Sequence, residues 1–290
     1  MAEQTRSVPA VREFVGAGRH PALDAAIRIF RSPVGLTSGA VLLLVILGAV
    51  FADVAQDPLR SSRDVFAGPS LSHPFGTDDQ GRDQFSRVLQ GARISLWVGF
   101  LATAGGCLLG AAWGLLSGFV GSWLDLVSQR VVDAMLALFF VSIYTPGVTT
   151  GIIAIILVII PFNARVIRSA VLAVKENVYV EAARVIGAGP TRIMLRHILP
   201  NVVAPILIMM STVLGAAILI EAGLAFLGMG AQPPTPSWGL MLSGKGRQFM
   251  ELAPWLAIFP AIAISITVLA FNLLGDVVRD VLDPRLRGSR

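Results

Sequence analysis

Long apolar stretches alternate with short polar segments along most of this chain. A helix needs about 20 mostly apolar residues to cross the hydrocarbon core of a bilayer, and six stretches meet that requirement. They are residues 34–54, 94–120, 123–144, 148–171, 202–228 and 254–277. The pattern predicts an all-α membrane protein with six transmembrane helices.

The third stretch is the weakest of the six because three charged residues interrupt it. Asp125, Arg130 and Asp133 lie within it, and a charge near the bilayer centre costs at least ~2.5 kcal/mol on insertion scales. Arg130 and Asp133 are three residues apart, so on a helix they can pair and reduce that cost. We therefore expect this stretch to span the membrane as well.

The polar segment 175–200, between the fourth and fifth stretches, predicts a helical hairpin. Residues 177–186 contain helix-forming residues without Pro or Gly, which predicts a short first helix. Apolar residues recur on this helix at helical spacing: Val178, Ala182 and Val185. Gly187 then allows a sharp change of direction, because glycine tolerates a positive φ.

A second short helix is predicted to begin at Pro190, where the missing N–H would have no intrahelical partner anyway. We expect this helix to run to about Leu199 and to end at Pro200, which cannot continue the hydrogen-bond ladder. Arg192 and Arg196 lie one turn apart on one face. A polar hairpin with basic residues, set between two apolar stretches, predicts a docking surface for another protein.

The long loop between the first two stretches also contains a helix signal. Thr77 followed by Gln80 is a capping-box pattern, which predicts a helix that starts at Thr77. Its apolar residues follow helical spacing: Phe85, Val88, Leu89 and Ala92. We expect an amphipathic helix that lies at the membrane interface before the chain turns inward. Two roles remain open for it, a lid over the bundle or contact with an outside partner.

Composition and charge agree with a membrane protein and orient it. Hydrophobic residues make up 54% of the 290 residues and charged residues 14%, whereas about 25% of a soluble domain is charged. Lys and Arg concentrate in the segments that share one side of the membrane, so the N-terminus, the hairpin and the C-terminus are expected to be cytoplasmic. The net charge of +5 follows from this topology. Without interleaved basic and aromatic residues, it does not indicate nucleic-acid binding.

These boundaries divide the chain into five parts. We expect the first apolar stretch to be an uncleaved anchor, because the segment before it is rich in Arg and lacks an apolar core. The parts are a cytoplasmic segment 1–33, a first transmembrane helix 34–54, an extracytoplasmic loop 55–93, a five-helix core 94–282 that includes the hairpin 175–200, and a cytoplasmic tail 283–290.

Within the apolar stretches, small and ionisable residues stand out. The spacing of Gly106 with Gly110, and of Gly114 with Gly118, favours close helix packing in the second stretch. Glu221 is a carboxylate in an apolar setting, and such a residue is a candidate functional site. A structural role, in which an Arg or backbone donors satisfy the carboxylate, stays open. The three His residues are too dispersed along the chain to form a metal site.

Several motifs occur together in one order along the chain. They are the segment 73–83 (HPFGTDDQGRD), Glu181-Ala182-Ala183 with Gly187, Arg196-His197-Ile198-Leu199-Pro200-Asn201, Glu221-Ala222-Gly223-Leu224, Gln232-Pro233-Pro234, and Ser237-Trp238-Gly239. In this order they resemble the permease subunits of bacterial ATP-binding-cassette importers, specifically the oligopeptide/dipeptide (and nickel) branch. The resemblance extends over nearly the whole chain from about Leu36.

The resemblance implies how the two polar regions are used. The hairpin corresponds to a coupling helix that docks on a separate ATPase, and the residues implied are Glu181, Ala182, Ala183, Arg184, Gly187, Arg192 and Arg196. The extracytoplasmic residues implied to face a substrate-binding protein are Asp78, Asp79, Arg82, Asp83 and Trp238. Gly244-Lys245-Gly246 lacks the spacing of a phosphate loop. ATP and Mg are therefore expected on partner subunits, with no cofactor and no catalytic residue on this chain.

The expected assembly contains a homologous second permease, one or two cytoplasmic ATPase subunits and an extracytoplasmic substrate-binding protein, in the bilayer of a bacterial inner membrane. Its substrate is expected to be an oligopeptide or dipeptide, with nickel as the alternative. Candidate pore residues are Asn163, Ser211 and Glu221. A proton-coupled secondary carrier is less favoured, because the two halves of the chain show no inverted repeat.

Overall fold

The computed structural model describes residues 21–54, 57–121 and 146–282, together with 127, 130, 131 and 134. This part of the chain is helical, and two isolated β-bridges occur in the loop before α3. Its elements are α1 (Pro21–Arg31), α2 (Pro33–Val50), η1 (Phe51–Val54), α3 (Gln84–Val120), α5 (Val148–Lys175), α6 (Val178–Val185), α7 (Pro190–Ile193), η2 (Met194–Ile198), α8 (Leu199–Phe226), α9 (Trp238–Leu242), α10 (Gly244–Gln248) and α11 (Trp255–Leu282).

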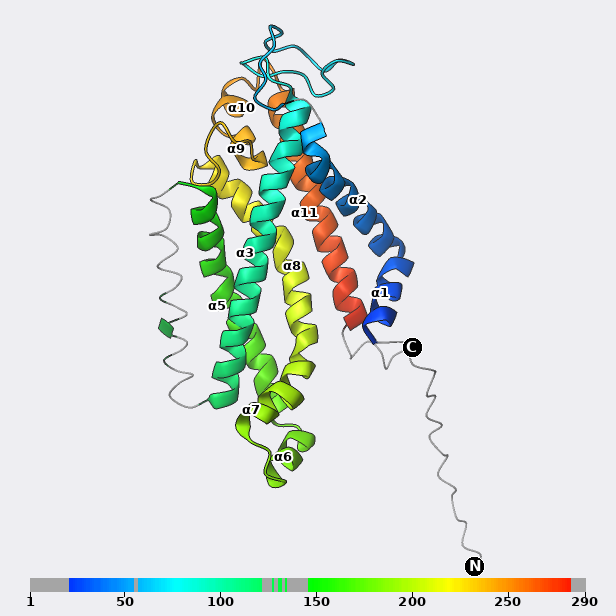
Figure 1. The fold of residues 1–290 in the computed structure, drawn as a ribbon, viewed down its shortest axis with the longest axis vertical. Helices are drawn as coiled ribbons and strands as arrows, with labels where there is room; N and C mark the ends of the chain where they lie inside the picture. Colours follow the sequence, from blue (N-terminus) through cyan, green and yellow to red (C-terminus); the bar gives the residue numbers. More distant parts are fainter. Residues whose placement is uncertain are drawn as a thin grey trace, which may run out of the picture.

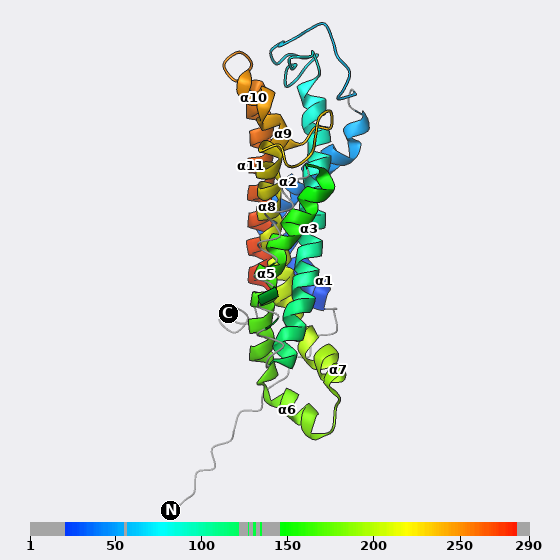
Figure 2. The same cartoon turned by 90° about the vertical axis from the view of Figure 1, so that its left-hand side faces the viewer.

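Five helical stretches of the described residues are long and apolar enough to cross a membrane. They are Pro33–Asp53, Gln84–Val120, Val148–Lys175, Pro190–Phe226 and Trp255–Leu282, and they include five of the six predicted spans. The predicted span 123–144 lies outside the described residues except at four positions, so the count of six stays a prediction. The long helices lie side by side in a bundle (Figures 1 and 2).

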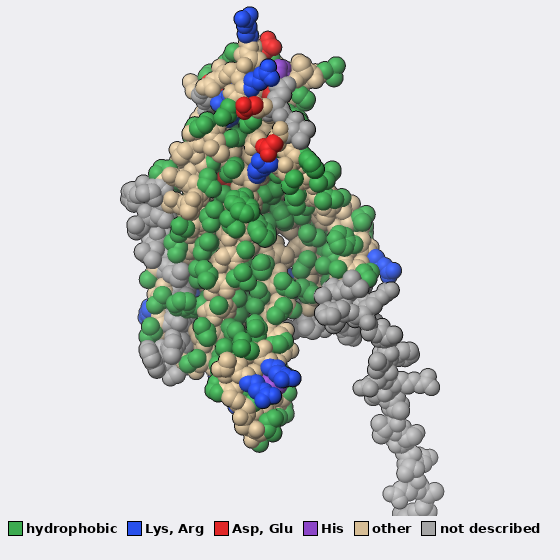
Figure 3. Space-filling view, viewed as in Figure 1, with side chains coloured by type: hydrophobic (Ala, Val, Ile, Leu, Met, Phe, Trp, Pro, Cys, Tyr) green, Lys and Arg blue, Asp and Glu red, His purple; other side chains and the backbone are tan. Residues whose placement is uncertain are grey.

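The surface of the bundle is consistent with a bilayer around its middle. In Figure 3, apolar side chains cover the central part of the visible face, and charged side chains gather at its two ends. One end consists of the hairpin α6–α7 (Figure 2). The opposite end carries residues 57–83, which we call the cap. The lengths of the helices and this distribution of charge together indicate a protein that crosses the membrane several times.

Glycines let α3 and α5 approach each other closely. A Cβ atom at Gly106 would lie 2.5 Å from Ile159 Cγ2, and one at Gly114 would lie 2.5 Å from the backbone oxygen of Ala164. Contacts at these distances are possible only without a side chain. The small-residue faces predicted for the second stretch therefore pack against α5.

Replacing Gly114 by Ala should destabilise the protein by about 1–3 kcal/mol, because the added methyl group meets backbone that cannot move aside cheaply. Gly151→Ala on α5 is the matched control, since a Cβ there meets nothing within 4 Å. Thermal unfolding of the two purified variants measures the difference. Equal midpoints would contradict this account of the contact.

The helix predicted to start at Thr77 does not form. Gly76 and Gly81 have φ values of +74° and +67°, which no helix can contain, and the Thr77 hydroxyl group bonds within the cap instead. The helix α3 begins at Gln84, because the Asp83 carboxylate accepts the N–H of Ser86 and caps it. The amphipathic segment then continues straight into the second span. It is not a separate interfacial helix.

Pro200 does not end the second arm of the hairpin, contrary to the prediction. The segment η2 is a π-helix, in which the N–H of Leu199 reaches Met194 O, and Pro200 falls within the first turn of α8. Just before the proline, the backbone hydrogen bonds change from the i→i−4 pattern to the i→i−5 pattern of a π turn. The helix therefore continues through Pro200 although this residue has no N–H to donate. The hairpin therefore continues as one helical stretch into the fifth predicted span.

The N-terminal segment contains a helix that the sequence analysis did not predict. The helix α1 packs against α2 and α11, and Ser32 separates it from α2 by capping the latter. Residues 1–20 and the tail 283–290 lie outside the described residues.

Candidate functional site

The hairpin is attached to the bundle by an apolar cluster. Val180 and Ala183 of α6 are buried in this cluster together with Ile193 and Ile198 of the second arm. The cluster also contains residues of three long helices, α3, α5 and α8: Ala111, Leu115, Ile167, Val171 and Val202. A displacement of the hairpin is therefore transmitted to all three helices, since packed interiors deform little.

The hairpin turns by a Schellman motif at the end of α6. The N–H of Ala188 donates to Ala183 O, and the N–H of Gly187 donates to Arg184 O, each at 3.0 Å. Gly187 has a φ of +82°, the left-handed conformation that this motif requires at its glycine. The glycine predicted to allow the turn is thus needed for its backbone geometry.

The apolar stripe predicted on the first helix is present, but it faces away from the bundle. Val178 and Val185 are each 80% exposed, and the adjacent Ile186 is 84% exposed. Val180 and Ala183, on the other face of α6, make the contact with the bundle. The hairpin therefore presents aliphatic side chains that no described part of this chain covers.

The predicted coupling residues divide between these two faces. Glu181, Ala182, Arg184 and Gly187 are exposed on the first arm, and Arg192 and Arg196 are exposed on the second. Ala183 is buried and anchors the hairpin, so its predicted place on the contact surface is wrong. The exposed set lies at one tip of the molecule (Figure 2).

Within the cap, the predicted partner-facing acids are instead used internally. Asp78 accepts a hydrogen bond from Arg82 Nε at 2.6 Å and the backbone N–H groups of Gln80 and Arg82. Asp83 caps α3 and lies 3.0 Å from His73 Nδ1. Asp78 and Asp83 are both 5% exposed. The prediction that these two side chains contact a partner is corrected: they shape the cap. The predicted roles of Asp79 and Arg82 stay predictions.

Trp238 is likewise buried, at 1% exposure, and is not available to a partner. Its indole Nε1 donates to Val88 O at 2.9 Å. Gly91 leaves room for the ring, because a Cβ there would lie 3.0 Å from Trp238 Cδ1. Trp238 therefore joins α9 to α3, which corrects its predicted role.

The three candidate pore residues are on long helices, and two of them are buried between helices. Asn163 packs against Gly110 of α3 and donates to Ile159 O at 3.2 Å. Glu221 is 3% exposed, lies near Ser95 and Ser237, and its buried Oε2 has no hydrogen-bond partner among the described residues. Ser211 donates to Ile208 O and borders an apolar cavity of about 300 Å³ between α3, α8 and α11. Their role in a pore stays a prediction.

Residues that the sequence analysis did not single out complete these sites. Ser95 of α3 and Ser237 of the segment before α9 lie close to the Glu221 carboxylate. Arg87 of α3 lines a cavity at the cap end together with charged residues of the cap. No pattern within the sequence indicates this cavity.

Comparison with known proteins gives one family for these features. The family described as binding-protein-dependent transport system inner membrane component matches residues 110–288. The dipeptide transport system permease protein DppC of Alkalihalophilus pseudofirmus is 39% identical over 92% of this chain and 91% of its own length. The glutathione transport system permease protein GsiD of Escherichia coli O157:H7 is 43% identical over 90% of this chain and 89% of its own length. GsiD of Shigella sonnei is similar to the same extent.

Proposed function

We propose that this chain moves small peptides into the cytoplasm, because it belongs to the binding-protein-dependent transport system inner membrane components. Within them it is a permease subunit of the peptide family of ATP-binding-cassette importers. The observation that carries the proposal is the hairpin. It exposes an aliphatic face to a partner and is packed rigidly onto three long helices. The names of relatives that cover most of the chain, dipeptide and glutathione permeases, support a peptide substrate.

The partner at the hairpin is proposed to be a cytoplasmic ATPase that binds ATP and Mg. Val178, Val185 and Ile186 would enter an apolar groove on this subunit, and the exposed arginines Arg184, Arg192 and Arg196 would meet acidic groups around it. When ATP draws the ATPases together, the hairpin moves and displaces α3, α5 and α8 through their shared cluster. Together with a second, homologous permease, this produces alternating access to the pore.

Six spans with both termini in the cytoplasm are proposed for the topology. Successive contacts of α3 and α5, Gly106 with Ile159 and Gly118 with Val171, show that the two helices run in the same direction. The connection between them must return from the hairpin end to the cap end. This supports a sixth span at 123–144. The basic residues of the hairpin support its cytoplasmic location, and the cap is then extracytoplasmic, where a substrate-binding protein would deliver the peptide.

Purification through a tag on this chain, in mild detergent, tests the assembly, and uptake of a radiolabelled dipeptide into cells tests the substrate. We expect a nucleotide-binding ATPase and a second permease to co-purify, and uptake to be lost when this chain is deleted. Recovery of this chain alone would contradict the proposal that it is a subunit of an importer complex. Unchanged dipeptide uptake, with loss of nickel uptake instead, would contradict the substrate.

A further inference from the structure

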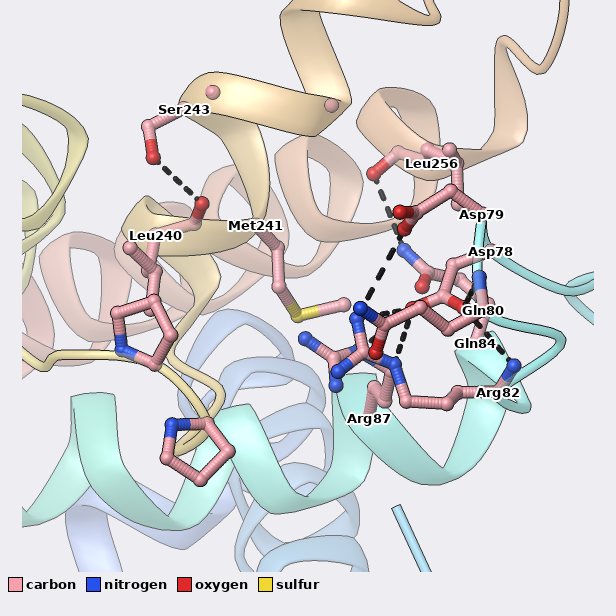
Figure 4. Close-up of a pocket in the computed structure, with 14 residues that line it drawn as sticks. Asp78, Asp79, Gln80, Arg82, Gln84, Arg87, Leu240, Met241, Ser243 and Leu256 are labelled. Carbon is pink, nitrogen blue, oxygen red and sulfur yellow. Dashed lines mark hydrogen bonds and ion pairs between the residues drawn. The ribbon is translucent and has the colours of Figure 1, made fainter. Parts of the chain in front are cut away.

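A cavity of about 310 Å³ opens at the cap end (Figure 4). Its wall consists of cap residues, the first turn of α3, the segment from Pro233 to Gly246 and Leu256 of α11. Small-molecule sites begin at about 300 Å³, so the cavity has room for a ligand of a few residues and not for a folded partner.

Arg82, on the cap side of this cavity, makes short contacts with Asp78. Its Nε and one of its terminal nitrogens each lie 2.6 Å from Asp78 Oδ2. The other oxygen of Asp78 accepts two backbone N–H groups. These short contacts hold the cap together, so we do not assign Arg82 as the ligand anchor.

Arg87, one turn into α3, is placed differently. Its Nε lies 3.7 Å from Asp78 Oδ2, beyond hydrogen-bond distance. Within the described residues, the hydrogen bond that its guanidinium group makes is a long one, from Nη1 to Pro58 O at 3.5 Å. The side chain is 11% exposed. Asp78 and Asp79 supply negative charge nearby, but a guanidinium group has five N–H donors, and most of those of Arg87 remain for a ligand.

The orientation of Arg87 directs these donors into the cavity. In Figure 4 its guanidinium group lies beside that of Arg82 and points toward Met241 on the opposite wall. Met241 and Leu240 give that wall an apolar surface. The cavity thus combines a buried cation with an apolar wall, which suits a carboxylate attached to a short aliphatic group.

We propose that this cavity binds the C-terminal carboxylate of a small peptide, with Arg87 as its anchor. The inference rests on the proposed function and orientation, because only a peptide importer with the cap outside would meet its substrate there. The site would hold the peptide between its release from the binding protein and its entry into the pore. It would favour peptides with an unmodified C-terminus, because only a charged carboxylate forms two parallel hydrogen bonds with a guanidinium group.

Equilibrium binding to the purified importer in nanodiscs, without its binding protein, tests the assignment. The probes are radiolabelled dialanine and the same dipeptide with an amidated C-terminus. We expect the wild-type complex to bind the acid about tenfold more tightly than the amide, corresponding to ~1.4 kcal/mol. Arg87→Gln should reduce this preference to within about twofold. Arg63→Gln, which removes an exposed arginine of the cap outside the cavity, should leave it unchanged.

A second variant covers the case in which Arg87→Gln disturbs the cap. Leu240→Trp would fill the cavity from the opposite wall while Arg87 is kept, and should weaken dialanine binding about tenfold. Unchanged binding in Leu240→Trp, or an acid preference that survives in Arg87→Gln, would overturn the proposal.

Two further outcomes separate this inference from its premise. In the first outcome, the wild-type importer binds neither probe, and Arg87→Gln weakens the stimulation of ATP hydrolysis by the peptide-free binding protein. The cavity would then receive an acidic side chain of the binding protein, and the proposal would be wrong. Dialanine uptake by the complete importer tests the proposed function independently. If dialanine is taken up but the importer binds the acid no more tightly than the amide, only the peptide-binding role of the cavity is refuted. If no peptide is taken up, the proposed function is refuted.

Discussion

Replacing Val185 and Ile186 together by Asp is expected to abolish peptide uptake while the protein remains folded and inserted. Both side chains are at least 80% exposed, so their loss removes little of the chain's own core. If each is buried in a groove of the ATPase, it contributes about 1.5–3 kcal/mol of apolar burial. Losing both, and placing two charges in that groove, should weaken docking more than about a hundredfold. Co-purified ATPase and dipeptide uptake measure the effect.

Leu71→Asp is the matched control, because Leu71 is a fully exposed aliphatic residue in the cap at the other end of the molecule. It should leave ATPase recovery unchanged. The thermal unfolding midpoint of the hairpin variant should also match that of the wild type, which separates a docking defect from misfolding. Full ATPase recovery with the Val185 and Ile186 variant would show that the hairpin docks by another surface.

The sequence predicted the hairpin well because its determinants are local. Gly187 is required by the turn, and the absence of Pro and Gly from residues 177–186 permits the helix. Which face of α6 meets the bundle was not predictable from periodicity. Val178 and Val185 form the more regular stripe, but Val180 and Ala183 are buried. An apolar stripe can serve a partner chain as well as the chain's own core, and spacing alone does not distinguish the two.

The cap shows where local patterns were misleading. The capping-box pattern of Thr77 and Gln80 fails because Gly81 interrupts it with a positive φ and because Asp83 caps α3. The burial of Asp78 depends on Arg82, whose charge the sequence analysis assigned to the surface. A charged residue in a loop is usually exposed. The sequence therefore does not indicate that Asp78 and Arg82 pair and are buried together, because their contact depends on how the loop folds.

The ends of the bundle also contain contacts between residues far apart in sequence. Glu221 meets Ser95 of α3 and Ser237 of the segment before α9. Trp238 bonds to a backbone oxygen 150 residues earlier in the chain. These contacts are decided by how helices pack, which helical periodicity limits but does not fix. The hydrophobic pattern therefore predicted the five spans that the structure describes, while the residues that join them at the cap end required the structure.

Trp238→Ala is expected to destabilise the protein by about 3–5 kcal/mol, because it opens a cavity where an almost fully buried indole packs against Gly91. The Val88 carbonyl oxygen would also lose the hydrogen bond from the indole. Trp238→Phe keeps most of the ring volume and should cost less. Trp97→Ala is the matched control on α3, since Trp97 is 59% exposed. Thermal unfolding in detergent ranks the three variants.

The result tests whether Trp238 holds α9 against α3. If the side chain holds α9 against α3, stability falls in the order Trp97→Ala, Trp238→Phe, Trp238→Ala. The binding protein then stimulates ATP hydrolysis to the same extent per folded molecule in every variant. A Trp238→Ala variant that kept the unfolding midpoint of the wild type and lost that stimulation would contradict this role. The burial of Trp238 and the bond from its indole to Val88 favour the first result. The segment after α8 would then contribute to transport by holding the helices together at the cap end. A displacement of the helices that starts at the hairpin would therefore reach the cap end.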